Sequence, residues 1–201
     1  MDCTNIRSMQ VGDLESIVQI HLDAFPHFFL TFLGPAFLSK LYLCILYDKS
    51  GIAFVYAPDS RIVGFVVGTD QPSGFYHRVL RRHWWRFGLA SISSVIKQPM
   101  IIPRLLRAFS SPYQFQAPQG SGTLMSIAVN PDAQGSGVGQ ILLHAFMKEA
   151  SCRGLSMINL TTDRCENDRV NRFYRKAGFT LSRTLTTHEG REMNEYSIKL
   201  H

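Results

Sequence analysis

The segment that most constrains this chain is a glycine-rich loop between an apolar run and an amphipathic stretch. Residues 130–139 read Asn-Pro-Asp-Ala-Gln-Gly-Ser-Gly-Val-Gly. Glycine lets a backbone approach a ligand because it has no Cβ, and the first amides of a helix have no partner within it. The helix dipole adds about half a positive charge at that end. The loop therefore predicts a phosphate or pyrophosphate site, with a connector that binds nothing as the alternative.

The residues around the loop exclude two familiar phosphate-binding motifs. A P-loop needs Lys and then Ser or Thr after its last glycine, whereas Gln140 and Ile141 stand there. A dinucleotide-binding fingerprint needs its first glycine at the end of the strand and an acidic residue about 20 residues later. Here residues 130–134 separate the strand from the first glycine, and position 157 is Met.

The periodicity of apolar residues predicts the elements on both sides of the loop. Before it, the pattern indicates a strand, two helices and two strands over residues 4–7, 13–25, 35–47, 52–56 and 62–67. From residue 123 onward it indicates a strand, a helix, a strand, a helix and a hairpin over residues 123–129, 138–153, 157–161, 168–177, and 179–187 with 192–200. This order predicts one α+β domain over residues 1–201, with helices on both faces of a mixed, mostly antiparallel sheet.

Composition places the chain among folded proteins of a reducing compartment. Hydrophobic residues make up 45% of it and charged residues 18%, which excludes a disordered or collagen-like chain. The four cysteines form no C-x-x-C pair and no zinc pattern, and residues 1–10 lack the apolar run of a signal peptide. We therefore expect a cytoplasmic protein without a metal.

Gly34 and Pro35 interrupt the apolar residues 25–47, so that stretch favours a buried helix pair over a membrane span.

A second motif follows downstream, where residues 167–179 read Asn-Asp-Arg-Val-Asn-Arg-Phe-Tyr-Arg-Lys-Ala-Gly-Phe. Together with Gln134-x-x-Gly137-x-Gly139 it resembles the GNAT acetyltransferases. Their loop reads Gln/Arg-x-x-Gly-x-Gly/Ala, and their second signature is similar to residues 167–179. The resemblance covers residues 123–179 closely. It implies a six- to seven-stranded sheet splayed around the cofactor, and transfer of an acetyl group from acetyl-CoA (coenzyme A) to an amine without a metal.

The resemblance also implies roles for individual residues. The amides that would bind the cofactor's pyrophosphate belong to Gln134, Gly135, Ser136, Gly137, Val138, Gly139 and Gln140. The strand residues whose backbone would pair with the pantetheine arm are Ile127, Ala128 and Val129. Asn167 matches the position that contacts the arm, a role compatible with capping a helix.

Tyr174 matches the general acid, with a core tyrosine as the alternative. Because a phenol (pKa ~10) is a weaker acid than a thiol (~8.5), full proton transfer is uphill by roughly 2 kcal/mol. Tyr174 is therefore expected to act first as a hydrogen-bond donor.

No obvious general base is present. The two strands beside the cofactor offer only Thr123, Met125, Ser126, Asn159, Thr161 and Thr162. Asp163 and Glu166 are expected to be solvated loop carboxylates, and His144 to lie on the surface. Near the joint of the first two helices, which borders the acceptor in the family, lie Asp23, His27, Phe28 and Phe29. The last three are the acceptor-binding candidates.

The missing base favours a weakly basic acceptor reached through ordered water. Deprotonating an α-amine of pKa ~8 at pH 7 costs ~1.4 kcal/mol, whereas a lysine of pKa ~10.4 costs ~4.6 kcal/mol.

Residues 71–122 form an expected insertion with its own charge. No Asp or Glu lies between Gln71 and Pro131, and seven cations do, which exceeds the net charge of +6 for the whole chain. Three interpretations stay open. The insertion is a solvated lobe or lid, a pocket for an anionic acceptor such as a nucleotide-linked amino sugar, or a membrane-surface or nucleic-acid contact. Of the two contacts in the third interpretation, a membrane surface stays possible and nucleic acid is not an expected partner.

The sequence thus predicts an acetyl-CoA-dependent N-acetyltransferase that acts on a small or nucleotide-linked primary amine. Two alternatives remain, a protein N-terminal acetyltransferase and a non-catalytic acyl-CoA-binding regulatory module. Family members often pair through their C-terminal strands, and nothing in residues 180–201 decides between a monomer and a homodimer.

Overall fold

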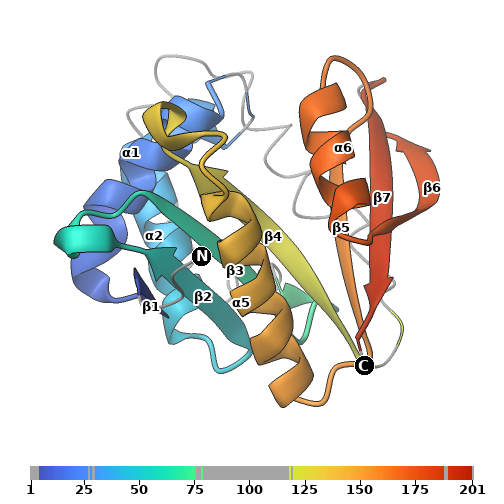
Figure 1. Cartoon of the computed structure of the whole chain (residues 1–201), viewed down its shortest axis with the longest axis horizontal. Helices are drawn as coiled ribbons and strands as arrows, with labels where there is room; N and C mark the ends of the chain where they lie inside the picture. Colours follow the sequence, from blue (N-terminus) through green and yellow to red (C-terminus); the bar gives the residue numbers. More distant parts are fainter. Residues whose placement is uncertain are drawn as a thin grey trace.

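A seven-stranded sheet forms the centre of the computed structural model, which describes residues 5–26, 28, 30–75, 78, 118, 120–187 and 190–200. The spatial order of the strands is β1-β2-β3-β4-β5-β7-β6 (Figure 1). Their bounds are β1 Ile6–Ser8, β2 Gly51–Tyr56, β3 Gly64–Thr69, β4 Ser121–Val129, β5 Met157–Asp163, β6 Thr180–Thr186 and β7 Glu192–Lys199. Neighbouring strands are antiparallel except β4 and β5, which are parallel.

The parallel pair β4–β5 is short, and the sheet opens beyond it. Only Ser121, Gly122 and Thr123 have partners on β5, and the last pair is Thr123 with Asn159. From there the two strands diverge, as Figure 1 shows. We call this opening the fork and the Thr123–Asn159 pair its vertex. The splayed, mixed sheet that the sequence predicts is confirmed.

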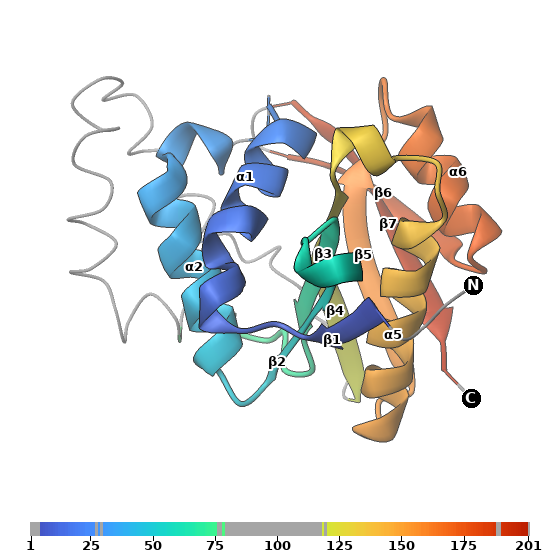
Figure 2. The same cartoon turned by 60° about the vertical axis from the view of Figure 1, so that its left-hand side comes forward.

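Two pairs of helices cover the opposite faces of the sheet (Figures 1 and 2). Their bounds are α1 Leu14–Ala24, α2 Pro35–Tyr47, α5 Val138–Cys152 and α6 Asp168–Lys176. The strands alternate between the two cores: Phe65 and Val67 pack with α1 and α2, whereas Val66 packs with α5. Full burial of such a side chain stabilises the fold by about 1.5–3 kcal/mol, so the period-2 pattern of β3 holds both helix layers on the sheet.

A β-bulge shapes the strand that borders the fork. The β3–β4 register pairs Val67 with Ser126 and Gly68 with Leu124, which leaves Met125 as the extra residue. A Cβ on Gly68 would lie 2.2 Å from the carbonyl oxygen of Thr123 and 2.5 Å from the Phe146 ring, so only glycine fits there. A bulge of this kind bends its strand and re-aims the side chains that follow.

Most of the expected elements are present, with shifts at their ends. The helix expected over residues 35–47 has those bounds, whereas the first strand begins at Ile6 rather than residue 4. The third strand spans residues 64–69 instead of 62–67, because Val63 closes the hairpin by donating to the Tyr56 carbonyl. Strand β5 extends to Asp163 because β7 pairs with its full length.

Asp13 precedes α1 as expected but does not cap it with its side chain. Its carboxylate instead accepts hydrogen bonds from the Arg7 guanidinium and the Gln10 amide, all at 2.7 Å. The apolar residues 25–47 contain α2, and no helix in the described ranges is long and apolar enough to cross a bilayer.

The start of the expected insertion is described, and most of the rest lies outside the described residues, including the helical periodicity around 79–89 and 101–109. Phe75 is buried in the core under α1 and α2. Arg78 stacks 5.9 Å from its ring and donates to the Ser73 and Gln71 carbonyls. The last expected insertion residues, 121 and 122, already belong to β4.

One buried histidine was not anticipated. His21 on α1 is 1% exposed; its Nδ1 lies 2.6 Å from the Tyr42 hydroxyl, and its Nε2 has no hydrogen-bond partner in the part of the chain that the structure describes. Burial lowers the pKa of His21 from 6.5 to about 4, because the charged imidazolium would lose its hydration. His21 is therefore neutral at pH 7 and packs as an aromatic ring beside Phe25 and Phe28.

The depressed pKa predicts an acid-sensitive stability. His21 takes up a proton near pH 6.5 in the unfolded chain and only near pH 4 in the folded chain. The free energy of unfolding is therefore fully retained above pH 6.5 and falls as the pH drops from 6.5 to 4. The total decrease in the free energy of unfolding should reach about 3 kcal/mol. Urea unfolding at pH 7.5, 5.5 and 4.5 measures it. In His21→Phe the decline over this window should disappear, and an equal decline in the variant would contradict the assignment.

Candidate active site

The glycine-rich loop turns the chain from β4 into α5. The Asn130 side chain accepts from the Asp132 amide at 3.0 Å, and one 3-10 turn follows over Pro131–Ala133. Gly135 and Gly137 then adopt φ values of 88° and 86°. Side-chain-bearing residues rarely take this left-handed conformation, so glycine is needed for the turn. Gly137 is the residue immediately before the first turn of α5.

Only part of the loop's backbone is available to a ligand. The amides of Gln134, Ser136 and Gln140 donate to loop carbonyls at 3.0–3.4 Å. The four remaining amides, which donate to no described residue, belong to Gly135, Gly137, Val138 and Gly139. They lie at the positive end of α5, where N–H groups favour an anion. Of the seven predicted amides, these four are the ones that no described residue uses, and their binding of an anion stays a prediction.

The strand before the loop presents backbone groups to the fork. The Asn130 amide donates to the Val63 carbonyl of the chain leading into β3. Because alternate residues of an antiparallel strand bond to the same neighbour, Ala128 also points its main-chain groups toward β3, and Ile127 and Val129 point theirs the other way. No β5 residue pairs with them there. Ile127 and Val129 therefore offer an open strand edge, to which an extended ligand can add.

Asn167 ties the start of α6 to the end of β5. It does not cap the helix with its side chain. Its Nδ2 instead donates to the Thr162 hydroxyl at 2.8 Å and to the Asp163 carbonyl at 3.2 Å. The expected cap is thus replaced by a bond that closes the β5–α6 connection beside the fork.

One turn further along α6, the buried Asn171 forms a network that was not anticipated. Its Nδ2 donates to the carbonyls of Asp163 and Asn167, both at 2.8 Å. Its Oδ1 accepts from Asn194 at 2.9 Å and from the Tyr196 hydroxyl at 3.0 Å. An asparagine in the middle of a helical pattern gives no signal of this, because three of these four partners come from β5 and β7.

Tyr174 lies on the buried side of α6. It is 5% exposed, and its ring centroid is 5.1 Å from Phe173, 5.7 Å from Phe179 and 6.1 Å from Tyr196. Phe173 in turn reaches the first turn of α5, where a Cβ on Gly139 would contact its ring at 3.5 Å. Burial raises the pKa of the Tyr174 phenol above its usual value. The group is therefore a neutral hydrogen-bond donor across the physiological pH range.

Two contacts bridge the open end of the fork. Arg169 of α6 donates to the Gln134 side chain of the loop at 2.9 Å. On the other side, the Arg191 guanidinium lies 5.4 Å from the Phe28 ring and also bonds both carboxylate oxygens of Asp163. The first bridge joins the loop to α6, and the second joins the segment after α1 to β5.

The remaining predicted residues have different outcomes. Of the acceptor-binding candidates, Phe28 faces Arg191, whereas His27 and Phe29 lie outside the described residues. Asp163 is not the solvated loop carboxylate that was expected: it is the last residue of β5, and Arg191 neutralises it. Glu166 and Asp23 are exposed, and His144 is on the surface as predicted.

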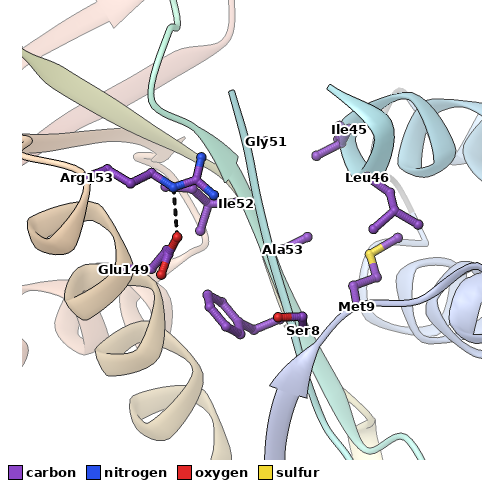
Figure 3. Close-up of a pocket in the computed structure, with 10 residues that line it drawn as sticks. Ser8, Met9, Ile45, Leu46, Gly51, Ile52, Ala53, Glu149 and Arg153 are labelled. Atoms are coloured by element: carbon purple, nitrogen blue, oxygen red, sulfur yellow. Dashed lines mark hydrogen bonds and ion pairs between the residues drawn. The ribbon is translucent and has the colours of Figure 1, made fainter. Parts of the chain in front are cut away.

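Two hollows lie away from the glycine turn. One, of about 230 Å³, lies between β1, β2, the end of α2 and the C-terminal turns of α5, where Glu149 and Arg153 pair at 2.8 Å (Figure 3). The other, of about 430 Å³, is lined by Asp168, Arg172, Arg175 and Lys176 of α6. Among the described residues no group of three or more His, Cys, Asp or Glu side chains could hold a metal ion.

Comparison with known proteins shows which family and which solved structures this chain is similar to. Residues 106–179 match the family model described as Acetyltransferase (GNAT) family. No curated protein sequence matches the chain. Among solved structures, ribosomal-protein-alanine N-acetyltransferase from Brucella melitensis is similar at 17% identity and a TM-score of 0.65, with 97% of this chain and 99% of that chain covered.

Two further solved structures are similar over nearly their whole length. The ribosomal-protein-S18-alanine N-acetyltransferase from Escherichia coli has 16% identity and a TM-score of 0.59, with 97% of this chain and 92% of that chain covered. A chimera of spermidine N-acetyltransferase SpeG from Vibrio cholerae and hSSAT has 15% identity and a TM-score of 0.60, with 96% and 94% covered. The chain therefore has the GNAT fold, and its resemblance to the GNAT acetyltransferase family is confirmed.

Proposed function

We propose that this protein is an acetyl-CoA-dependent N-acetyltransferase that transfers an acetyl group to the primary amine of a small acceptor by direct attack on the thioester. One observation carries the proposal. The four amides at the start of α5 and the open strand edge of Ile127 and Val129 border the same fork. A diphosphate on the amides and an extended amide-containing arm on the edge correspond to the pyrophosphate and the pantetheine arm of coenzyme A.

The chain's own residues divide the work. The amides of Gly135, Gly137, Val138 and Gly139 bind the pyrophosphate, and Arg169 adds positive charge beside them. Ile127 and Val129 align the pantetheine arm, and Asn167 holds the β5–α6 connection against which the arm lies.

Tyr174 donates a hydrogen bond to the departing sulfur. Because burial raises its pKa, the phenol acts mainly as a hydrogen-bond donor while the C–S bond breaks, and its proton moves to the sulfur only late; the proton that the attacking amine releases then restores the phenol through water.

The acceptor must lose its proton without help from a strong base. Asp163 is the carboxylate nearest in sequence to the fork edge of β5, and its bonds to Arg191 occupy both oxygens. A weakly basic amine needs little help, because deprotonating one of pKa ~8 at pH 7 costs only ~1.4 kcal/mol. We therefore propose a weakly basic primary amine as the acceptor, in a cytoplasmic, reducing setting.

Two acceptor classes remain candidates within this proposal. The small or nucleotide-linked amine rests on the basic residues of the insertion, of which Arg78 is described and bonds to the backbone of its own turn. The polypeptide α-amine gains support from neighbours named as ribosomal-protein-alanine N-acetyltransferases.

The test is thiol release. The protein is incubated with acetyl-CoA and a panel of α-amines, amino sugars, nucleotide-linked amino sugars and lysine side-chain analogues, and free coenzyme A is followed. Amine-dependent release with α-amines or amino sugars above lysine analogues is expected. Release that needs no amine would indicate hydrolysis only, and calorimetry with no heat on titrating acetyl-CoA would exclude the donor altogether.

Replacing Tyr174 by Phe separates the acid role from packing. The ring contacts persist, so coenzyme A affinity should stay within about twofold while kcat falls about 10- to 100-fold. Tyr196→Phe is the matched control, because its hydroxyl bonds Asn171 in the same cluster. That variant should lose about 1 kcal/mol of stability with kcat retained. Unchanged turnover in Tyr174→Phe would remove the role.

A second pair of variants tests the loop. Ala at Gly137 forces a side chain into the left-handed conformation at the start of α5, at a cost of about 1–2 kcal/mol. Coenzyme A affinity, measured by calorimetry, should fall at least about tenfold, because the amides move. Gly154→Ala imposes the same strain at the other end of α5, where φ is 76° and no atom lies within 4 Å. Equal loss of affinity in both would show that stability alone is responsible.

A further inference from the structure

A row of four polar side chains crosses the sheet at the vertex of the fork. The strand registers pair Thr69 with Thr123, Thr123 with Asn159, and Asn159 with Ser197. Such neighbours on adjacent strands lie about 4.8 Å apart.

All four project from the face that α1 and α2 cover. The residues next to them pack on the opposite face, where Leu124, Ile158 and Tyr196 belong to the core of α5 and α6. A Cβ on Gly68, next to Thr69, would likewise meet the α5 residue Phe146. The four polar side chains therefore form one continuous line from β3 to β7.

The outer members of the row are satisfied, and the inner two are not. Thr69 bonds the Ser50 hydroxyl at 2.8 Å and the Gln71 amide at 3.1 Å. Ser197 bonds the Ser182 hydroxyl at 2.7 Å. The Thr123 hydroxyl is buried, in a residue that is 2% exposed, and has no hydrogen-bond partner among the described residues. Asn159 is 5% exposed; no described residue bonds its side-chain amide, but that amide is not among the fully buried atoms without a partner, so it keeps some access to solvent.

An unpaired buried hydroxyl destabilises a fold, since it loses its hydrogen bonds to water and gains none. The Thr123 hydroxyl is such a group, and the Asn159 amide, which no described residue bonds, lies in register with it where β4 and β5 part; the pair is therefore placed for a ligand rather than for stability. Both are uncharged, and each can donate and accept. They match an uncharged group with the same capacity, such as an amide, and they offer no counter-charge to a cation.

We propose that Thr123 and Asn159 form the acceptor-recognition subsite and select an amine whose chain carries an uncharged amide, as a peptide amino terminus does. This inference rests on the proposed function. From Thr123 to Ile127 the strand advances three steps across its bulge, about 10 Å. Three extended peptide residues span that length, so the amine can lie at the thioester end while an amide reaches the vertex.

The experiment compares three acceptors of similar length: triglycinamide, n-octylamine and spermidine. In Thr123→Val, kcat/KM for triglycinamide should fall about 5- to 10-fold, the effect of one neutral hydrogen bond. For n-octylamine and spermidine it should change less than about twofold. Asn159→Ala should show the same selective loss. Thr123→Ser keeps the hydroxyl and should retain at least half of the wild-type value. Ser197→Ala, in the same row, should leave all three values unchanged.

Thermal unfolding gives an independent readout. Thr123→Val removes an unpaired hydroxyl, so Tm should stay constant or rise by about 2–4 °C. A lower Tm would show that the hydroxyl serves the fold and would overturn the proposal. So would an equal loss for all three acceptors, no loss for any, or a wild-type preference for spermidine.

A binding measurement distinguishes failure of the proposed function from failure of the subsite proposal. If wild-type protein releases no thiol with any amine, calorimetric titration of triglycinamide into the protein with coenzyme A still tests the subsite. Weaker binding to Thr123→Val than to wild type would support the subsite without catalysis. Equal affinities, or no binding to either protein, would overturn it.

Discussion

The parting of β4 and β5 is the constraint on which the site depends. Three parallel pairs hold the strands together, and beyond Thr123 the backbone groups of Ile127 and Val129 that point away from β3 have no partner on β5. Unpaired strand edges are normally covered or blunted, because they invite other chains to add. Here the edge lies between the two halves of the molecule, where a bound extended molecule can use it without aggregation. The bulge at Met125, which requires Gly68, re-aims the strand just before this edge.

An open fork needs other contacts to keep its halves in register. On the β5 side, Asn171 bonds the Asp163 and Asn167 carbonyls and accepts from Asn194 and Tyr196, so every polar atom of its side chain is used. A fully satisfied buried network of this kind specifies one arrangement. Across the opening, the Arg169–Gln134 bond and the stacking of Arg191 on Phe28 connect the halves near the loop. These bridges are partly exposed and weak, which suits an opening through which substrates pass.

The features that could be predicted from the sequence are those that depend on residues close together in the chain. The turn at Gly137, the start of α5 and the whole of α2 follow from glycine conformation, helix termini and apolar period, all of which are local. What it missed depends on strand pairing between distant segments. Asp163 was expected in a solvated loop, because nothing near it announces that β7 extends β5 and brings Arg191 to its carboxylate. Thr123 was set aside because it is no base, and its unpaired state is visible only once the register with Asn159 is known.

The electrostatics of the site divide along the fork. Positive charge gathers at the start of α5 and at Arg169, where a diphosphate would lie. The two groups at the vertex, Thr123 and Asn159, are neutral, and so is the Tyr174 phenol of α6, whose pKa is raised by burial. The one carboxylate that β5 contributes, Asp163, is matched by Arg191. A site of this kind would stabilise an anion at its mouth and would not attract a cation to the vertex, where the described residues offer no unpaired negative charge. In the proposed function, this neutrality accounts both for the lack of a strong base and for the preference for amines that lose their proton cheaply, so the proposed acceptor and the means of deprotonating it have a single physical cause.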